Sequence, residues 1–273
     1  MVLRLGPVNR NLLMAFEENL MRAEEYVYEI CKEINVPCSN VLVCDTTRKI
    51  INRDYMIVEY IKSIPLSNCV IDKEERAELH SEVGSYVKKL HSITNSGFGR
   101  VSYILTGKSY GTWYEYLIGE IDDITGRLQK LGSFTQEEIE NIKSVYQKNK
   151  NILDEVTIPK LIHSDLWEGN ILVEKKDEKY NVAAIIDSDR AIFGDVDFEF
   201  ASEWMINDDF MREYNTSNCI DEIGLTGDQT KKKLYLIIYA LIDAYVGLAQ
   251  YNNPNLYEDN REKVMKLVSE LLK

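Results

Sequence analysis

Two short apolar runs separated by a charged stretch are the most informative pattern of hydrophobic and polar positions in this chain. Residues 171–174 and 182–186 are rich in Ile, Leu, Val and Ala, whereas residues 175–179 read Lys-Lys-Asp-Glu-Lys. Apolar runs of this length on either side of a polar segment predict two antiparallel strands joined by a turn. The sequence therefore predicts a β-hairpin in the second half of the chain.

Oxygen-bearing side chains flank this predicted hairpin. Pairing about a centre inside the charged turn is expected to bring Asn170 and Asp187 side by side. One carboxylate and one amide oxygen suit Mg²⁺, which usually keeps waters and substrate phosphates among its ligands. Asp165 lies five residues before Asn170 and is a candidate to accept a proton from an attacking hydroxyl. The arrangement favours phosphoryl transfer over the alternative, an acidic surface loop beside an ordinary hairpin.

Elsewhere the apolar spacing is mostly helical. The expected helices cover residues 12–34, 73–91, 112–131 and 136–153, and the expected strands, at residues 41–44 and 55–60, lie between the first two helices. The longest apolar run, residues 234–251, contains Asp243 and several tyrosines. We therefore expect a core helix there and not a membrane span.

The segment from His163 to Asn170, His-Ser-Asp-Leu-Trp-Glu-Gly-Asn, together with Asp187, resembles the catalytic and metal-binding loops of the aminoglycoside phosphotransferase and choline kinase superfamily, relatives of protein kinases. Residues 194–201 resemble its G-D-x-x-x-D-L-A segment, with Glu199 where Asp is usual. Residues 35–37 and 56–60 resemble its strand and hinge segments, and residues 90–91 followed by 97–99 resemble its helix-end signature, so the resemblance covers most of the chain.

The resemblance implies an α+β, bilobal, protein-kinase-like fold. Residues 1–65 would form a small mixed nucleotide-binding lobe, and residues 66–273 a mainly helical lobe for catalysis and acceptor binding. ATP or GTP would lie between the lobes, with its base against backbone groups of three hinge residues, Glu59, Tyr60 and Ile61.

The resemblance also implies roles for residues of the catalytic loop. Mg²⁺ would be held by Asn170 and Asp187, while Asp165 orients the acceptor hydroxyl. His163 and Glu199 would brace the loop instead of reacting. Asp189 either tunes the metal from behind Asp187 or is simply solvated.

Residues 2–5 resemble the third strand of a kinase-like small lobe, and alternation places Val2 and Arg4 on one face. Val2 would touch the base, and Arg4 would hold phosphate through its guanidinium fork. Glu24 is the best candidate for a partner carboxylate, because apolar residues follow it at helical spacing. The other candidates are Glu17, Glu18 and Glu25. An arginine on a surface strand is the simpler alternative.

The two strands and the glycine-containing loop that cover the nucleotide phosphates in this superfamily have no counterpart before Val2, and only Gly6 lies nearby. Either the native chain starts upstream, or this chain is a shortened form, or nucleotide binds beneath an incomplete roof. The last two interpretations predict weak nucleotide affinity, because backbone donors to the phosphates would be lost.

The composition of the 273 residues, 45% hydrophobic and 28% charged, is that of a globular protein with a sizeable core. A net charge of −13 argues against nucleic acid as a partner and would favour a cationic substrate, although an acidic surface also serves solubility alone. Five cysteines without a C-x-x-C pair, and no signal-peptide pattern, predict a cytoplasmic protein with reduced thiols that does not associate with membranes.

The expected reaction is transfer of the γ-phosphate to a hydroxyl of a small, cationic, aminoglycoside-like molecule. The alternatives are a kinase of choline, ethanolamine, an amino acid or a modified sugar, and a catalytically silent ligand-binding relative. Candidate acceptor-binding residues are Trp204, Asp208, Asp209 and Tyr239, with Asp243 nearby. The same residues also suit a helical core and helix caps.

Overall fold

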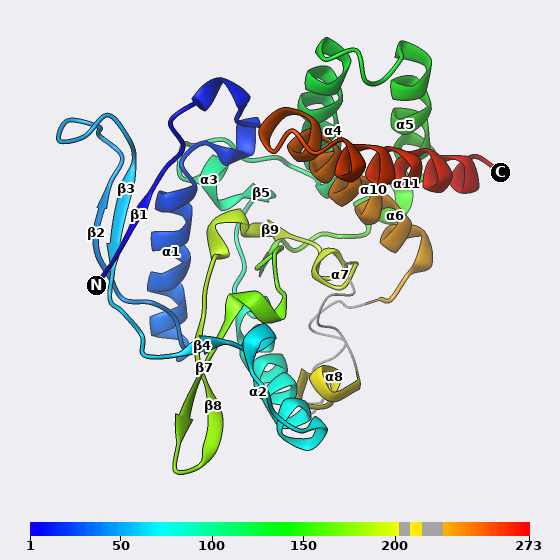
Figure 1. The fold of residues 1–273 in the computed structure, drawn as a ribbon. Helices are drawn as coiled ribbons and strands as arrows, with labels where there is room; N and C mark the ends of the chain where they lie inside the picture. Colours follow the sequence, from blue (N-terminus) through cyan, green and yellow to red (C-terminus); the bar gives the residue numbers. More distant parts are fainter. Residues whose placement is uncertain (202–207, 215–225) are drawn as a thin grey trace.

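The computed structural model describes residues 1–201, 208–214 and 226–273 (Figure 1). Its N-terminal part is an antiparallel sheet with strand order β1-β3-β2, beside one helix, α1 (Leu20–Glu33). The strands are β1 (Val2–Leu5), β2 (Val41–Asp45) and β3 (Tyr55–Val58). Arg4 pairs with Met56, which is fully buried. Since paired residues point to the same face of a sheet, Arg4 is directed inward.

Helix α1 begins eight residues later than the sequence predicted. Two short 3₁₀ turns precede it, η1 (Arg10–Leu12) and η2 (Ala15–Glu17). Asn19 then adopts a left-handed conformation with φ of 63°, which a right-handed helix cannot include. The helix therefore starts at Leu20 and buries one face against the core. The buried residues of α1 are Ala23, Glu24, Val27, Tyr28 and Cys31.

The second part of the molecule is mainly helical. Its longer helices are α2 (Lys73–His91), α4 (Trp113–Lys130), α5 (Gln136–Lys148), α10 (Gln229–Tyr245) and α11 (Pro254–Leu272). Capping boxes at Thr112 and Thr135 fix the starts of α4 and α5, because each threonine side chain and the glutamate three residues later satisfy free N–H groups. The single helix expected over residues 136–153 is divided, and α6 (Lys150–Asp154) follows Asn149. The Asn149 side chain bonds the carbonyl of Val145 and ends α5.

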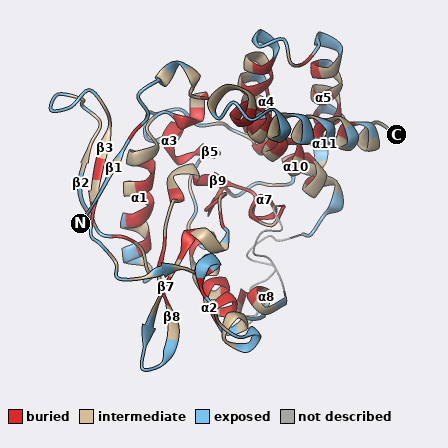
Figure 2. Ribbon diagram, viewed as in Figure 1, coloured by how far each residue is buried: buried red, intermediate tan, exposed pale blue. Residues whose placement is uncertain are grey.

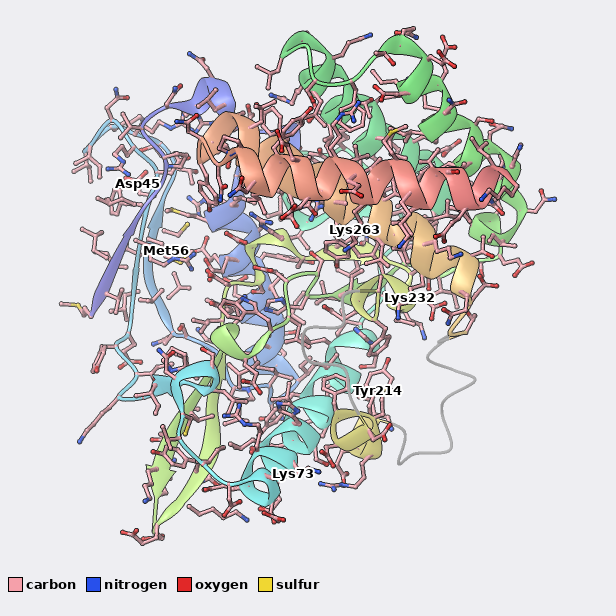
Figure 3. The ribbon with its side chains drawn as sticks, turned by 45° about the vertical axis from the view of Figure 1, so that its right-hand side comes forward. Asp45, Met56, Lys73, Tyr214, Lys232 and Lys263 are labelled. Atoms are coloured by element: carbon pink, nitrogen blue, oxygen red, sulfur yellow. The ribbon has the colours of Figure 1, made fainter. Side chains whose placement is uncertain are left out.

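Helix α10 lies in the core of this lobe. With the π-helical turn η6 (Val246–Gln250) it forms a segment long and apolar enough to cross a membrane. Its side chains are nevertheless largely buried against α4 and α11, and α11 runs across it in Figure 3. Figure 2 shows the buried residues concentrated where these helices meet. This packing is that of the expected core helix.

Two further three-stranded sheets lie beside the helices. One has the order β4-β7-β8, and the other β5-β9-β6. Their strands are β4 (Ile64–Pro65), β5 (Gly99–Arg100), β6 (Lys160–Ile162), β7 (Ile171–Lys176), β8 (Lys179–Ile185) and β9 (Ile192–Gly194). The short helical segments are η3 (Leu66–Asn68), α3 (Val101–Ile104), η4 (Glu168–Asn170), η5 (Ser188–Arg190), α7 (Val196–Glu199) and α8 (Asp208–Tyr214). Helix α8 packs on α2, where Figure 3 shows Tyr214.

The predicted hairpin is β7 and β8, but its register differs from the expected one. The turn is tight, because Asp177 and Glu178 both have positive φ, as a two-residue hairpin turn requires. This turn places Lys176 opposite Lys179, a register that alone would pair Asn170 with Ile185, and a bulge between Leu172 and Val173 shifts the pairing by one residue. The Ile186 N–H donates to the carbonyl of Asn170 at 2.9 Å. The expected direct pairing of Asn170 with Asp187 was therefore wrong by one residue.

The fold is α+β and bilobal, as expected. Helix α1 of the small lobe packs against η5 and α3 of the large lobe, so the two parts share an extended contact. We keep residue 65, the end of β4, as the proposed boundary between them.

Candidate active site

The catalytic loop follows β6 and is anchored from below by a buried carboxylate. The backbone N–H groups of His163 and Ser164 donate to Glu199, at 2.5 and 3.0 Å. Glu199 is only 1% exposed. Burial alone would raise its pKa, but His91, 3.7 Å away, and His163 lower the pKa of Glu199 below the usual range. An ionised carboxylate therefore holds the start of the loop.

The side chains of this loop bind the neighbouring hairpin and helix. His163 Nε2 lies 3.0 Å from the carbonyl oxygen of Ile186, and its Nδ1 accepts the backbone N–H of Asp165 at 3.3 Å. The hydroxyl of Ser164 donates to the carbonyl of Arg190 at 2.6 Å. These bonds satisfy both ring nitrogens of His163, so its geometry is that of a structural residue.

Asp165 and Asn170 are in direct contact. Asn170 Nδ2 donates to the Asp165 backbone carbonyl at 2.7 Å and to its carboxylate at 3.3 Å. Burial raises the pKa of Asp165, and the charge of Asp187 adds to this, whereas Arg190 and His163 act in the opposite direction. The Asp165 carboxylate lines a cavity of about 430 Å³ together with Ser67, Trp167 and Glu168.

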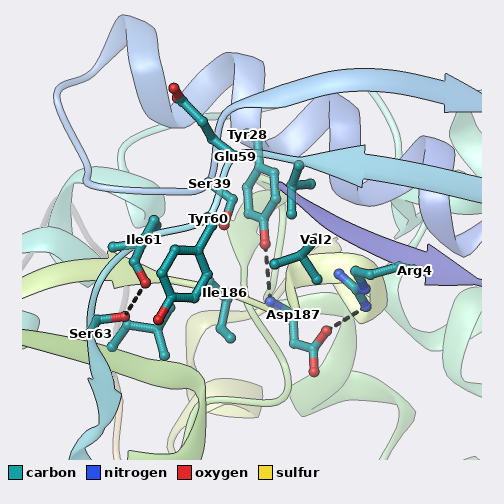
Figure 4. Close-up of a pocket in the computed structure, with 12 residues that line it drawn as sticks. Val2, Arg4, Tyr28, Ser39, Glu59, Tyr60, Ile61, Ser63, Ile186 and Asp187 are labelled. Atoms are coloured by element: carbon teal, nitrogen blue, oxygen red, sulfur yellow. Dashed lines mark hydrogen bonds and ion pairs between the residues drawn. The ribbon is translucent and has the colours of Figure 1, made fainter.

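Asp187 follows the second strand of the hairpin, beside Asn170, and belongs to a chain of charged groups. Arg4 Nη2 donates to Asp187 Oδ1 at 2.6 Å, and Arg4 Nη1 forms an ion pair with Glu24. The Tyr28 hydroxyl donates to Glu24 at 2.6 Å and lies 3.2 Å from the Asp187 backbone N–H (Figure 4). Burial would lower the pKa of Arg4, but the two carboxylates outweigh it and raise the pKa. The expected Arg4–Glu24 pair is present.

This charged chain borders a second cavity of about 380 Å³, within the range of small-molecule sites. Val2, Arg4 and Asp187 line it from one side, and the hinge residues Glu59, Tyr60 and Ile61 line it from the other (Figure 4). The Glu59 N–H is bonded to Asn40, whereas within the described chain the N–H groups of Tyr60 and Ile61 have no intramolecular acceptor. They remain available to a ligand's base.

The oxygen donors next to this cavity fit a magnesium ion. The Nδ2 of Asn170 is bonded to Asp165, which leaves its Oδ1 for a ligand. The Asp187 side chain is 42% exposed, and only its Oδ1 faces Arg4. The described residues contain no cluster of three or more His, Cys, Asp or Glu side chains suited to a metal. A site of one carboxylate and one amide oxygen suits Mg²⁺ that keeps waters and phosphates, not a closed protein cage.

Asp189 lies in η5, so its position does not follow the strand alternation assumed from the sequence. It is not simply solvated. Burial, followed by the charges of Glu24 and Asp187, raises the pKa of Asp189 to about 7. It lines a cavity with Arg4, next to the proposed metal ligands.

The predicted acceptor-binding residues that the structure describes are not brought together. Trp204 lies outside the described residues. Asp208 is exposed on α8, and Asp209 on the same helix lies 3.7 Å from Arg212. Neither lines the described part of the Asp165 cavity. The Tyr239 hydroxyl instead lies 3.3 Å from the Ser164 carbonyl oxygen, beneath the catalytic loop. Helix packing, which spacing along the chain does not specify, separates these residues.

Three residues near the site were missed. Tyr28 lies four residues after Glu24, so helical spacing could have revealed it. Trp167 is 43% exposed in the Asp165 cavity, and its place inside the motif was a signal. Arg190 acts electrostatically on Asp165 and Asp189, and nothing in its local sequence marks it.

A bilobal α+β fold with this loop, this hairpin and two adjoining cavities defines a kinase-like phosphotransferase. The chain belongs to the phosphotransferase enzyme family (APH), whose profile matches residues 15–221. No curated protein matches the sequence significantly.

Solved structures share the fold at low sequence identity. The ADP-bound aminoglycoside phosphotransferase APH(2'')-Ib is 17% identical, with a TM-score of 0.59 over 100% of this chain and 92% of its own. A thermostable mutant of APH(4)-Ia with AMP-PNP and hygromycin B is 18% identical, with a TM-score of 0.61 over 91% and 82%. The GDP and kanamycin complex of an APH(2'') enzyme is 12% identical, with a TM-score of 0.60 over 93% and 85%.

Proposed function

We propose that this protein transfers the γ-phosphate of ATP or GTP to a hydroxyl of a small cationic molecule of the aminoglycoside class. The observation that carries the proposal is the position of the catalytic hairpin between two cavities. Asp187 lines one cavity with the hinge, and Asp165 lines the other. The nucleotides and aminoglycosides bound to the structural neighbours support both halves of the proposal.

The nucleotide would lie in the hinge cavity, with its base against residues 59–61 and its phosphates towards Arg4. Asn170 and Asp187 would hold Mg²⁺, which when bound neutralises phosphate charge. Arg4 already donates to Asp187, so it would exchange that contact for phosphate oxygens when nucleotide binds.

Asp165 would orient the acceptor hydroxyl and receive its proton. Asn170 and the His163 ring hold Asp165 through its carbonyl and N–H, so its carboxylate is positioned before the acceptor arrives. Only the ionised form can accept the proton. Because the pKa of Asp165 is raised, transfer is expected to slow at acidic pH sooner than for an ordinary aspartate.

The Asp165 cavity favours a cationic acceptor. Trp167 presents an exposed indole there, and a cation binds well over such a ring. The indole packs on Gly169, where any added Cβ would lie 2.2 Å from it, so its position is fixed. Burial raises the pKa of the nearby Asp243, and the charge of Asp165 adds to this. The same indole supports the second candidate, a kinase of choline or ethanolamine, because quaternary ammonium groups bind aromatic faces.

The test is a panel of aminoglycosides, choline, ethanolamine, amino acids and sugars, assayed with labelled ATP and GTP. One acceptor class should turn over. Asp165→Asn should lower kcat by about 10²–10⁴-fold while nucleotide affinity is kept. Asp177→Asn, on the exposed hairpin turn, is the matched control and should have the same kcat and nucleotide affinity as the parent. No turnover on any acceptor, with nucleotide still bound, would favour a silent binding protein. Full activity of Asp165→Asn would contradict the mechanism.

A further inference from the structure

A polar cavity of about 240 Å³ lies away from both catalytic cavities, at the end of the small sheet. It is formed where the segment after β1 meets the turn between β2 and β3 (Figure 1). Three arginines line it, Arg10, Arg48 and Arg53, and Asp54 is its one carboxylate among the described lining residues. Three asparagines, Asn9, Asn11 and Asn52, complete its polar wall.

The arginines are held by specific contacts. Arg48 donates from Nε to Asp54 Oδ1 at 2.7 Å and from Nη2 to Oδ2 at 3.1 Å. Arg10 Nη1 reaches the same Oδ2 at 2.9 Å. Arg53 Nε donates to the Gly6 carbonyl at 2.7 Å. Both chain segments are thus tied together, and the guanidinium groups are fixed in orientation before any ligand arrives.

Positive charge outweighs negative charge among the described residues that line this cavity. Three guanidinium groups face one carboxylate there, in a chain whose total charge is −13, and the charge of Glu18 acts on Arg48 from outside the lining. Each guanidinium has five N–H donors, and the contacts above use one or two of them. Like charges held together repel, and a bound anion would relieve this repulsion while filling the unused donors.

We propose that this cavity is a binding site for a dianionic phosphate group, free or as a monoester. Guanidinium forks match the oxygens of a tetrahedral phosphate, and a charge of −2 complements the cavity. The site shares no described lining residue with the hinge cavity, and the cavity lined by Arg4, Asp189 and Arg10 lies between the two. Its occupant would bridge the segment after β1 and the β2–β3 turn.

The test is a titration of the whole protein with inorganic phosphate in chloride buffer, followed by NMR of the arginine Nε–Hε signals. A parallel titration with methyl phosphate distinguishes a free phosphate from a monoester by which binds more tightly. Saturable shifts are expected at Arg10, Arg48 and Arg53. Arg48→Gln and Arg53→Gln should each weaken binding about tenfold.

The controls separate this site from general charge and from the nucleotide site. Arg212→Gln, half-exposed on α8, removes the same charge and should leave affinity unchanged. Arg4→Gln should also leave it unchanged, although it would impair nucleotide binding. If Arg48→Gln fails to fold, Arg53→Lys still tests the guanidinium fork and should weaken binding. The proposal is overturned if no saturable shift occurs, if sodium chloride alone gives the same shifts, or if Arg212→Gln loses as much affinity.

Discussion

The two chain ends of the catalytic hairpin, the loop before β7 and the residues after β8, lie side by side but are held in different ways. The loop carrying Asp165 rests on Glu199, which is 1% exposed and binds backbone N–H groups. At the other end, the Asp187 and Arg4 side chains are 42% and 31% exposed and hold each other by an ion pair. Buried bonds are costly to break, whereas an exposed ion pair contributes little net stability.

This difference suits the proposed roles of the two ends. A residue that orients the acceptor must keep one position, so a dry network of backbone bonds is appropriate. The residues that meet nucleotide and metal must change partners, and partly hydrated charges can do so at small cost. The predictions below test whether the two ends differ in energy as well as in structure.

The largest expected effect is at the buried end. Glu199→Gln replaces an ionised acceptor of two N–H groups with an amide, so one buried donor loses its partner. We expect the free energy of unfolding to fall by about 3 kcal/mol. Urea unfolding measures this, with Glu29→Gln on the exposed face of α1 as the control. Glu199→Asp, the usual residue of the family, should lose less. If Glu199→Gln were as stable as Glu29→Gln, the buried bonds of Glu199 would not stabilise the loop as proposed.

The acid dependence of this effect follows from the lowered pKa of Glu199. A carboxylate whose pKa is lowered by folding stabilises the protein above its ordinary pKa, and this contribution is lost as the pH falls through the lowered value. The difference between the parent and Glu199→Gln should therefore shrink in acid.

The second effect concerns Arg4 and Glu24, which link the exposed end to the core. Glu24 is fully buried, so Arg4→Met leaves its charge without a cation, and we expect a loss of about 2 kcal/mol. In the Arg4→Met background, Glu24→Gln should lower the free energy of unfolding by less than it does in the parent protein. A double-mutant cycle measures this coupling. The control cycle is Arg22 with Glu25, a more exposed pair on the same helix, where coupling below about 0.5 kcal/mol is expected. Equal coupling energies in both cycles would show that the burial of Glu24 does not strengthen its interaction with Arg4.

The third effect is the pH dependence of stability due to Asp189. Folding raises its pKa to about 7, so its contribution is complete below the ordinary value near 4 and is lost as the pH rises through 7. Without divalent cations, the parent should lose about 2 kcal/mol relative to Asp189→Asn between pH 4 and pH 8, after allowance for partial exposure. Urea unfolding at both pH values measures it, with Asp177→Asn as control. Parallel pH profiles for parent and Asp189→Asn would contradict it.

The sequence predicted what local signals specify. Helix α2 matches the expected residues 73–91 because its apolar spacing and its cap at Asp72 agree. The Arg4–Glu24 pair was implied by the resemblance of residues 2–5 to a kinase-like strand, and helical spacing selected Glu24 among the candidate carboxylates. The catalytic segment was found because its residues are adjacent in the chain.

Long-range packing was not predictable in the same way. The bulge between Leu172 and Val173 helps to set the partner of Asn170, and no residue type marks it. Arg190, in η5, acts on Asp165 because β9 pairs with β6 and so brings η5 beside the catalytic loop. Tyr239 was assigned to the acceptor because an aromatic residue in an apolar helix suits a pocket and a core equally well.

The smallest expected effect separates these two roles of Tyr239. Its hydroxyl lies 3.3 Å from the Ser164 carbonyl oxygen and 3.4 Å from that of Phe198, so Tyr239→Phe should cost about 1 kcal/mol of stability. Tyr245→Phe is the matched control, because this hydroxyl on the same helix donates to the distant Leu12 carbonyl at 3.0 Å. Both variants should lose similar stability, but only Tyr239→Phe should lower kcat, by a few-fold, since it loosens the loop beneath Asp165. The acceptor KM should not change, because the hydroxyl faces the loop. A rise in KM with kcat unchanged would instead support the original assignment of Tyr239 to acceptor binding.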